Sequence, residues 1–245
     1  MEKKKPIVAF FDIEVSPLKI SAWKTWEADS LRVEEEWYIL SFAVKLGDSA
    51  TKVYSLNQFD SEKELVKKLW EYFDKANILV GHNSDRFDVK KSNARFMFHG
   101  LTPPSPYKTI DTLKVARKYF AFTSNRLDAL GEYLGVGRKV KHEGMDLWFS
   151  CMKGDEKAFS RMRKYNKGDV DLLYAVYNKL KPYMVNHPSL TIYEEIDGCP
   201  VCASSNLQRR GFGATKTGKH RRFHCQDCGA WSKGKNIKTE VEIVN

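Results

Sequence analysis

Short hydrophobic stretches separated by turn residues dominate the first 80 residues of the chain. The stretch IVAFFDIEV is rich in β-branched and aromatic side chains and lies between Pro6 and Pro17, which is typical of a buried strand. Two later stretches flank Gly47-Asp48-Ser49, a sequence that favours a hairpin turn. The pattern predicts strands at residues 7–15, 37–46, 51–56 and 78–80.

Hydrophobic residues at helical spacing follow Ser61. Leu65, Leu69 and Phe73 share one face of an amphipathic helix with Ser61 as its N-cap. The proline-rich residues 102–106 predict a loop. Further helices are predicted at residues 86–98, 126–134 and 156–181. Strands followed by alternating helices and short strands indicate an α/β fold, with a mixed sheet flanked by helices.

The composition fits a folded protein without a membrane anchor. The chain has 245 residues, of which 42% are hydrophobic, and this is enough for one catalytic-sized domain and a small second one. No stretch reaches the roughly 18 apolar residues of a membrane span. The first apolar run stops at Asp12, too early for an export signal, so we expect a cytoplasmic protein with no membrane partner.

The charge is basic and unevenly distributed. There are 41 Lys and Arg against 31 Asp and Glu, which favours a polyanionic partner, nucleic acid first. Residues 199–245 hold nine Lys and Arg against three Asp and Glu, so more than half of the net +10 lies in this last fifth. A surface charge that only confers solubility is the alternative.

Three segments place carboxylates where a metal site could form. Asp12 and Glu14 are two apart on a predicted strand, so both project from one face. Buried neighbouring carboxylates repel unless they bind a proton or a cation, and Mg²⁺ or Mn²⁺ suits an oxygen-rich pair. A solvated strand edge is the alternative.

The second and third segments are weaker when taken singly. GHNSDRFD (residues 81–88) lies where a short strand passes to a helix, a common place for ligands in α/β sheets. Asp88 is the better ligand candidate, whereas Asp85 could cap the helix. Tyr165 and Asp169, four apart, share one helix face. Each segment alone is also consistent with solvated residues at a helix start or on a helix surface.

Together, FFDIEV, GHNSDRFD and YNKGDVD resemble the three exonuclease motifs of the DEDD superfamily, in the right order, over residues 5–182. The tyrosine in the third motif is similar to the proofreading domain of family B DNA polymerases. The histidine version would need His at position 164, which is Lys164. The resemblance implies an RNase H-like fold and degradation of nucleic acid from its 3′ end. Without a polymerase domain, the chain resembles free-standing phage and bacterial exonucleases.

The resemblance also assigns roles. It implies that four acids hold two Mg²⁺ or Mn²⁺ ions, namely Asp12, Glu14, Asp88 and Asp169. Two such ions would generate hydroxide and stabilise the leaving oxygen. Tyr165 would orient the attacking water and Asn83 would contact the strand near its 3′ end. Phe87 would stack on a base, with core packing as the alternative.

Aromatic and basic residues alternate shortly after Glu14. Trp23 and Trp26 lie close to Lys19 and Lys24. This composition favours binding of a single strand through stacking and charge. A hydrophobic flap that covers the domain is the alternative.

Two C-x2-C pairs close to the C-terminus indicate zinc. Cys199 and Cys202 are separated by 22 residues from Cys225 and Cys228, which fits a tetrahedral site with four thiolates. About 47 residues with few aliphatic side chains need metal for folding energy. We therefore predict an RNase H-like domain at 1–185, a linker at 186–198 and a zinc-ribbon domain at 199–245.

The residues between the cysteine pairs are strongly basic. They predict a two-stranded ribbon that resembles the zinc ribbons of transposases. We expect this ribbon to bind phosphates through six cations, namely Arg209, Arg210, Lys216, Lys219, Arg221 and Arg222. Docking on a protein partner is the alternative.

The sequence as a whole predicts a metal-dependent 3′→5′ exonuclease. We expect DNA rather than RNA as substrate, with single-stranded 3′ ends preferred. An RNA exonuclease, a structure-specific endonuclease and a non-catalytic nucleic-acid-binding protein are the alternatives.

Overall fold

The computed structural model describes residues 6–24, 26, 31–141, 143–194, 197–215 and 218–237. It separates into two compact units, one comprising Ile7–Val176 and the other containing the residues from Tyr177 onward. The domain boundaries inferred from composition, at 185/186 and 198/199, stay a prediction.

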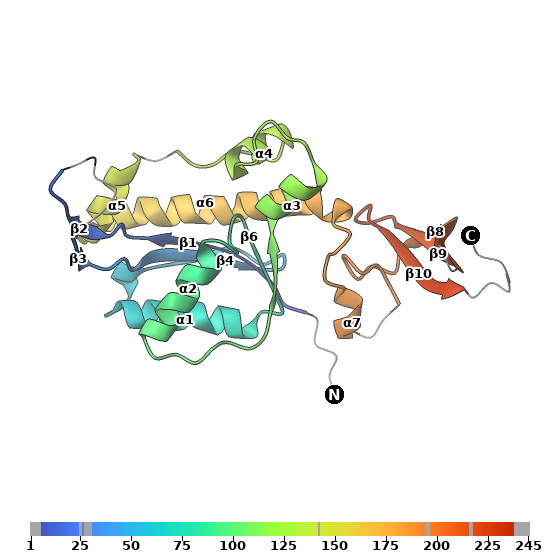
Figure 1. The fold of residues 1–245 in the computed structure, drawn as a ribbon, viewed down its shortest axis with the longest axis horizontal. Helices are drawn as coiled ribbons and strands as arrows, with labels where there is room; N and C mark the ends of the chain where they lie inside the picture. The colour runs from blue at the N-terminus through green and yellow to red at the C-terminus, as the bar shows by residue number, and fades with distance from the viewer. Residues whose placement is uncertain are drawn as a thin grey trace. The chain divides into compact units, whose positions relative to one another are not determined.

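The larger unit is built on a five-stranded mixed sheet (Figure 1). β1 pairs with β4 in antiparallel fashion and with β6 in parallel fashion. The remaining pairs are β4 with β5, antiparallel, and β6 with β7, parallel. The strands, in sheet order, are β5 (Lys52–Ser55), β4 (Ile39–Leu46), β1 (Val8–Val15), β6 (Ile78–Gly81) and β7 (Lys108–Asp111). The predicted mixed α/β sheet is confirmed.

Helices cover both faces of this sheet. α1 (Glu62–Lys75) and α2 (Asp88–Phe98) pack on one face, where Phe11 of β1 meets Phe73 with ring centroids 5.0 Å apart. α6 (Glu156–Leu180) covers the other face, where Phe10 packs edge-on against Tyr174 at 5.1 Å. The shorter helices of this unit are η1 (Leu56–Gln58), α3 (Thr112–Tyr119), α4 (Leu127–Tyr133) and α5 (Met145–Met152). β1 is therefore buried on both faces, which explains its hydrophobic sequence.

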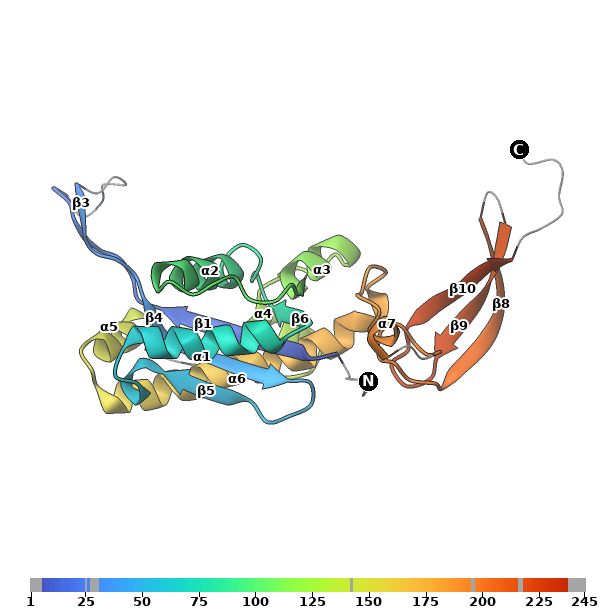
Figure 2. The same ribbon diagram turned by 90° about the horizontal axis from the view of Figure 1, so that it is seen from below.

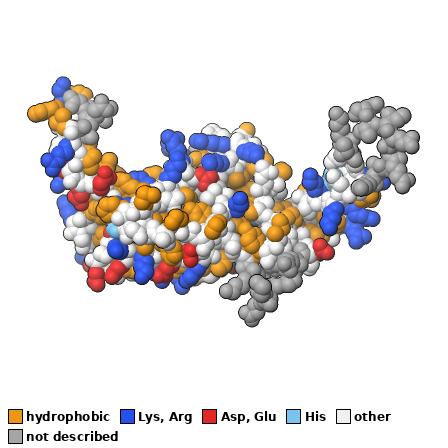
Figure 3. Space-filling view, turned by 60° about the horizontal axis from the view of Figure 1, so that its bottom comes forward, with side chains coloured by type: hydrophobic (Ala, Val, Ile, Leu, Met, Phe, Trp, Pro, Cys, Tyr) orange, Lys and Arg blue, Asp and Glu red, His pale blue; other side chains and the backbone are white. Residues whose placement is uncertain are grey.

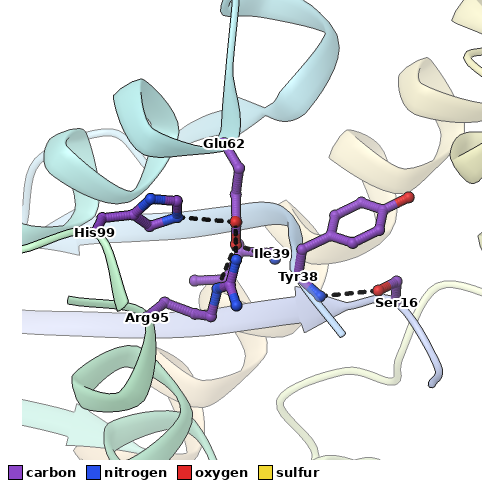
Figure 4. A network of polar contacts seen from close by, with 6 residues as sticks. All are labelled: Ser16, Tyr38, Ile39, Glu62, Arg95 and His99. Atoms are coloured by element: carbon purple, nitrogen blue, oxygen red, sulfur yellow. Dashed lines mark hydrogen bonds and ion pairs between the residues drawn. The ribbon is translucent and has the colours of Figure 1, made fainter. Parts of the chain in front are cut away.

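A buried ion pair joins α1, α2 and β4 (Figure 4). The Glu62 carboxylate accepts hydrogen bonds from the backbone N–H of Ile39 at 2.9 Å and from Arg95 Nε at 2.8 Å. His99 Nε2 lies 2.9 Å from the same carboxylate. The side chains of Glu62 and Arg95 are only 12% and 8% exposed. Because Arg95 belongs to α2, this network fixes the helix that begins at Asp88.

A hairpin extends from the larger unit (Figure 2). It pairs β2 (Lys19–Ser21) with β3 (Arg32–Glu35), and it was not predicted. Trp23 and Trp26 in the segment between these strands are each 80% exposed. Such exposure does not fit a hydrophobic flap packed on the domain, and it leaves both rings accessible for stacking.

The smaller unit contains η2 (Lys181–Tyr183), α7 (Leu190–Glu194) and a three-stranded antiparallel sheet. Its strands are β8 (Leu207–Thr215), β9 (Gly218–Cys225) and β10 (Trp231–Ile237), with β9 in the middle. The predicted two-stranded ribbon was incomplete, because β10 adds a third strand that lacks a run of β-branched residues. In the part of the chain that the structure describes, no helix combines the length and apolarity needed to cross a membrane.

Candidate active site

The carboxyl end of β1 presents the first two acids. β6 pairs with β1 only from Val8 to Phe10 and ends at Gly81, so the following residues of β1 lose this neighbour. The backbone N–H of Ile13 instead donates to Asp88 Oδ1 at 3.2 Å. Asp12 and Glu14 flank Ile13, and like Phe10 they lie on the face of β1 that α6 covers.

α6 completes a group of three acids. Carboxylate oxygens of Asp12, Glu14 and Asp169 all lie within 4.8 Å of one another, and Asp169 is 2% exposed. Asn166, one turn before Asp169, donates to Asp12 Oδ2 at 2.7 Å. Ser41 of β4 in turn donates to Asn166 Oδ1 at 3.1 Å. Asn166 and Ser41 thereby hold the Asp12 carboxylate in position.

Burial and mutual repulsion perturb these acids. Burial, followed by the charges of Glu14 and Asp88, raises the pKa of Asp12 well above its usual range. Burial and the charge of Asp169 raise the pKa of Glu14 to about 8. Burial also raises the pKa of Asp88 to about 7. These acids therefore need a positive charge to be ionised together at neutral pH.

The three-acid group fits a hard divalent cation. Its donors are all carboxylate oxygens, which Mg²⁺ and Mn²⁺ prefer. Asp88, the fourth predicted ligand, lies outside this group of three. It is 5% exposed and adjoins the group through its bond to Ile13. Three of the four acids predicted as metal ligands therefore lie together, with Asp88 beside them, and their role as ligands stays a prediction.

Lys139 supplies a positive charge that the sequence did not reveal. Its Nζ donates to Asp169 Oδ2 at 2.5 Å and to the Tyr165 hydroxyl at 3.2 Å. Burial alone would lower the pKa of Lys139, but the charge of Asp169 and the hydrogen bond to it raise that pKa overall. The ammonium is therefore a permanent countercharge for the acids.

Tyr165 remains protonated in this environment. It is 8% exposed, and burial together with the charges of Glu14 and Asp169 raises its pKa far above the ordinary value. The phenol can donate or accept a hydrogen bond, but it cannot act as a base near neutral pH. This behaviour suits a group that orients a water molecule.

A tight loop links β6 to α2. Asn83 adopts a positive φ of 64°, and its N–H donates to Asp111 Oδ1 at 2.8 Å. Asp111 also accepts from the N–H groups of Leu113 at 3.0 Å and Asp85 at 3.4 Å. Asp111 therefore shapes the loop, a role that its sequence context did not indicate. Asp85 does not cap α2, because its carboxylate pairs with Lys114 at 2.8 Å.

Two residues predicted to contact the nucleic-acid strand, Asn83 and Phe87, lie in this loop. Asn83 is partly exposed. Phe87, the residue before α2, is 38% exposed, with Lys91 Nζ 5.4 Å from its ring centroid. Phe87 is not among the buried core residues, so its ring is accessible for stacking. Whether either residue touches a strand stays a prediction.

The four cysteines form a second metal-binding group. Their sulfur atoms lie within 4.8 Å of one another, with Cys199 and Cys228 3.6 Å apart and Cys202 and Cys225 also 3.6 Å apart. Zn–S bonds of about 2.3 Å in a tetrahedron place sulfurs roughly 3.8 Å apart, so the spacing fits zinc. All four thiols are free of disulfides.

Both cysteine knuckles turn in the same way. The N–H of Ala203 donates to Cys199 O at 2.7 Å, and the N–H of Gly229 donates to Cys225 O at 3.1 Å. Both turn residues have positive φ, 61° for Ala203 and 77° for Gly229. Burial raises the pKa of Cys228 to about 11, whereas for Cys225 backbone N–H groups outweigh burial and lower it to about 7.

Exposed cations and aromatic rings alternate on the ribbon. Lys219 Nζ and the Arg221 guanidinium lie 5.4 and 5.3 Å from the Phe212 ring centroid. Arg222 lies 5.8 Å from Trp231, whose ring is half exposed. The remaining predicted contacts, Arg209 and Arg210, are exposed on β8, whereas Lys216 lies outside the described residues.

Comparison with known proteins agrees with this architecture. Residues 9–181 match the RNase H superfamily. Protein NEN3 of Arabidopsis thaliana is 31% identical over 85 residues, which cover 34% of this chain and 16% of the NEN3 chain. The superfamily match spans the five-stranded sheet and the three-acid group. The chain therefore belongs to the RNase H superfamily.

Proposed function

We propose that this protein is a metal-dependent 3′→5′ exonuclease that releases nucleotides from single-stranded DNA ends. The observation that carries the proposal is the meeting of Asp12, Glu14 and Asp169 within 4.8 Å, beside a tyrosine that stays protonated. Clustered acids repel phosphate, so a protein that only binds nucleic acid has no use for them. The resemblance of the three motifs to DEDD exonucleases supplies the direction of cleavage.

Each side chain of the site has a proposed role that follows from its chemistry. Asp12, Glu14 and Asp169, with Asp88 beside them, would hold two Mg²⁺ or Mn²⁺ ions. When bound, such ions supply a hydroxide near neutral pH and stabilise the leaving oxygen. Tyr165 donates its proton in a hydrogen bond to the attacking water and keeps it in line. Asn166 keeps the Asp12 carboxylate oriented through its amide.

The flanking loop and the ribbon would hold the strand. Asn83 contacts the backbone close to the 3′ end, and the exposed ring of Phe87 stacks on a base. The ribbon, folded around one zinc ion on its four cysteines, adds affinity through exposed arginines beside Phe212 and Trp231. Such binding weakens as salt rises.

The test uses end-labelled single- and double-stranded DNA and RNA, with Mg²⁺, Mn²⁺ or neither. We expect a ladder of products shortened from the 3′ end of single-stranded DNA, only with metal. Asp12→Asn and Asp169→Asn should each lower the rate by about 10³-fold or more. Asp171→Asn is the matched control, because Asp171 lies on the same helix but pairs with Lys167 at 2.6 Å. Equal cleavage by all four proteins would refute the proposal, and internal cuts or degradation of RNA alone would replace it with an alternative.

A further inference from the structure

A basic cavity lies beside the three-acid group. Its volume is about 700 Å³, and its walls come from the loop after β6, from α3 and from the segment that leads into α4. Lys139 lines the cavity and also contacts Asp169 through its ammonium. Asn83 lines the same cavity from the loop. Lys139 thus borders both the cavity and the three-acid group.

Most of the charges around the cavity already have partners. Asp111 accepts backbone N–H groups, and Asp128 accepts from the N–H of Lys139 at 2.7 Å and from Arg138 at 3.3 Å. Lys114 pairs with Asp85. Asp128 is therefore paired with Arg138, whereas Asp111 keeps its negative charge but is oriented by backbone N–H groups.

Three arginines remain uncompensated. Within the described ranges, Arg86, Arg117 and Arg126 form no ion pair with any carboxylate, and all three are exposed. They come from three different elements and converge on one cavity. Figure 3 shows Lys and Arg side chains gathered along the upper edge of the larger unit. Cations that only confer solubility need not meet at one cavity next to a group of acids.

We propose that this cavity binds backbone phosphates of the substrate strand next to the phosphate that is cleaved. Arg86, Arg117 and Arg126 are the phosphate ligands, because a guanidinium offers paired donors that match phosphate oxygens. This inference rests on the proposed nuclease function for the identity of the strand. The cavity sets affinity and leaves the chemical step to the acids.

Binding is measured separately from cleavage. The full chain, loaded with zinc but without Mg²⁺ or Mn²⁺, is titrated into a fluorescein-labelled 12-nucleotide single-stranded DNA, and anisotropy is followed at several salt concentrations. The test variant carries Arg86→Gln, Arg117→Gln and Arg126→Gln. The control carries Lys63→Gln, Lys67→Gln and Lys75→Gln, which remove the same charge from the exposed face of α1.

Three phosphate contacts predict a clear difference between the variants. The slope of log affinity against log salt is negative, and it should be shallower by about 2 in the arginine variant. Each phosphate contact to a single strand contributes about 0.7 to its magnitude. A fourfold rise in salt should therefore weaken the wild type about twentyfold more than this variant. The lysine control should keep the wild-type slope, and identical slopes for both variants would overturn the proposal.

Kinetics with Mn²⁺ separates this proposal from the proposed function. The arginine variant should show a KM at least about tenfold higher with kcat within threefold of the wild type. A fall in kcat at unchanged KM would overturn the phosphate assignment. If the arginine variant shows the reduced salt dependence of DNA binding but the wild type hydrolyses nothing, the nuclease function fails while the assignment of the cavity stands. If it hydrolyses DNA and the arginine variant binds normally, the cavity fails alone.

Discussion

Asp12→Asn should make the metal-free protein more stable while it abolishes activity. The three clustered carboxylates repel one another when no divalent cation is bound. Asparagine has nearly the same shape, and its carbonyl oxygen can still accept the hydrogen bond that Asn166 donates to Asp12 at 2.7 Å. The substitution therefore removes charge without removing the contact that orients this side chain.

The distances set the size of the effect. The ligand oxygens lie within 4.8 Å of one another, and at that separation two full charges repel by about 3.5 kcal/mol at an effective dielectric constant of 20. Proton uptake already relieves part of this repulsion, because burial and the neighbouring acids raise the pKa of Asp12 well above its usual range and that of Glu14 to about 8. We therefore expect a net gain of about 1–3 kcal/mol, or roughly 3–10 °C in Tm for a unit of this size.

The assay is thermal unfolding followed by far-ultraviolet circular dichroism, in buffer with one equivalent of zinc and no other divalent ion. Mn²⁺ at 100 times its Kd should then stabilise the wild type by about 2.7 kcal/mol and the variant by less. A variant less stable than the wild type in metal-free buffer would refute the repulsion argument. A wild type that Mn²⁺ leaves unchanged would refute the metal site itself.

Three further predictions concern the scaffold and the ribbon. Glu62→Gln should lower the free energy of unfolding in urea by about 3–5 kcal/mol, because it leaves Arg95 buried without its partner. The double variant Glu62→Gln, Arg95→Met should lose less than the sum of the losses in the two single variants. Burial lowers the pKa of His82 to about 4, so the unfolded chain binds a proton that the folded one does not. Stability should therefore fall by up to about 3 kcal/mol between pH 6.5 and pH 4, and urea unfolding of His82→Gln should show a flatter dependence. Ala203→Gly should tighten zinc binding by up to about 1 kcal/mol, because glycine adopts the positive φ of 61° without strain. Competition with a chelator measures this change, and weaker zinc binding in the variant would contradict the reasoning.

Buried elements with a strong hydrophobic signal were predictable, and short ones were not. β1 and α6 were predicted because each is long and has a buried face, which requires a recognisable hydrophobic pattern. β7 has only four residues, two of them exposed, so its sequence KTID shows no alternation. α5 begins after Gly144 with a positive φ and no side-chain cap, so the usual start signal is missing.

The candidate site divides in the same way. Asp12 and Glu14 were predicted because two acids in an apolar strand are unusual locally. Asp169 was predicted only because the three segments together, in their order, resemble the DEDD motifs. Asn166 was missed because its role depends on Asp12, which is 154 residues away in the chain. Lys139 was missed because a lysine in a basic segment resembles every other lysine. Residues that act through long-range contacts leave little trace in the sequence.

Lys139 gives the sharpest test of how the acids are kept charged. Its ammonium lies 2.5 Å from Asp169 Oδ2, so it competes with any divalent cation for that carboxylate. Lys139→Gln should tighten Mn²⁺ binding by at least about tenfold, because it removes the repulsion between the ammonium and the bound cation. A tenfold change in Kd corresponds to only about 1.4 kcal/mol. Calorimetric titration of the zinc-loaded protein measures this change. Lys167→Gln is the matched control, because Lys167 pairs with Asp171 on the same helix. Unchanged or weaker Mn²⁺ binding in Lys139→Gln would show that the ammonium does not occupy the position of a cation.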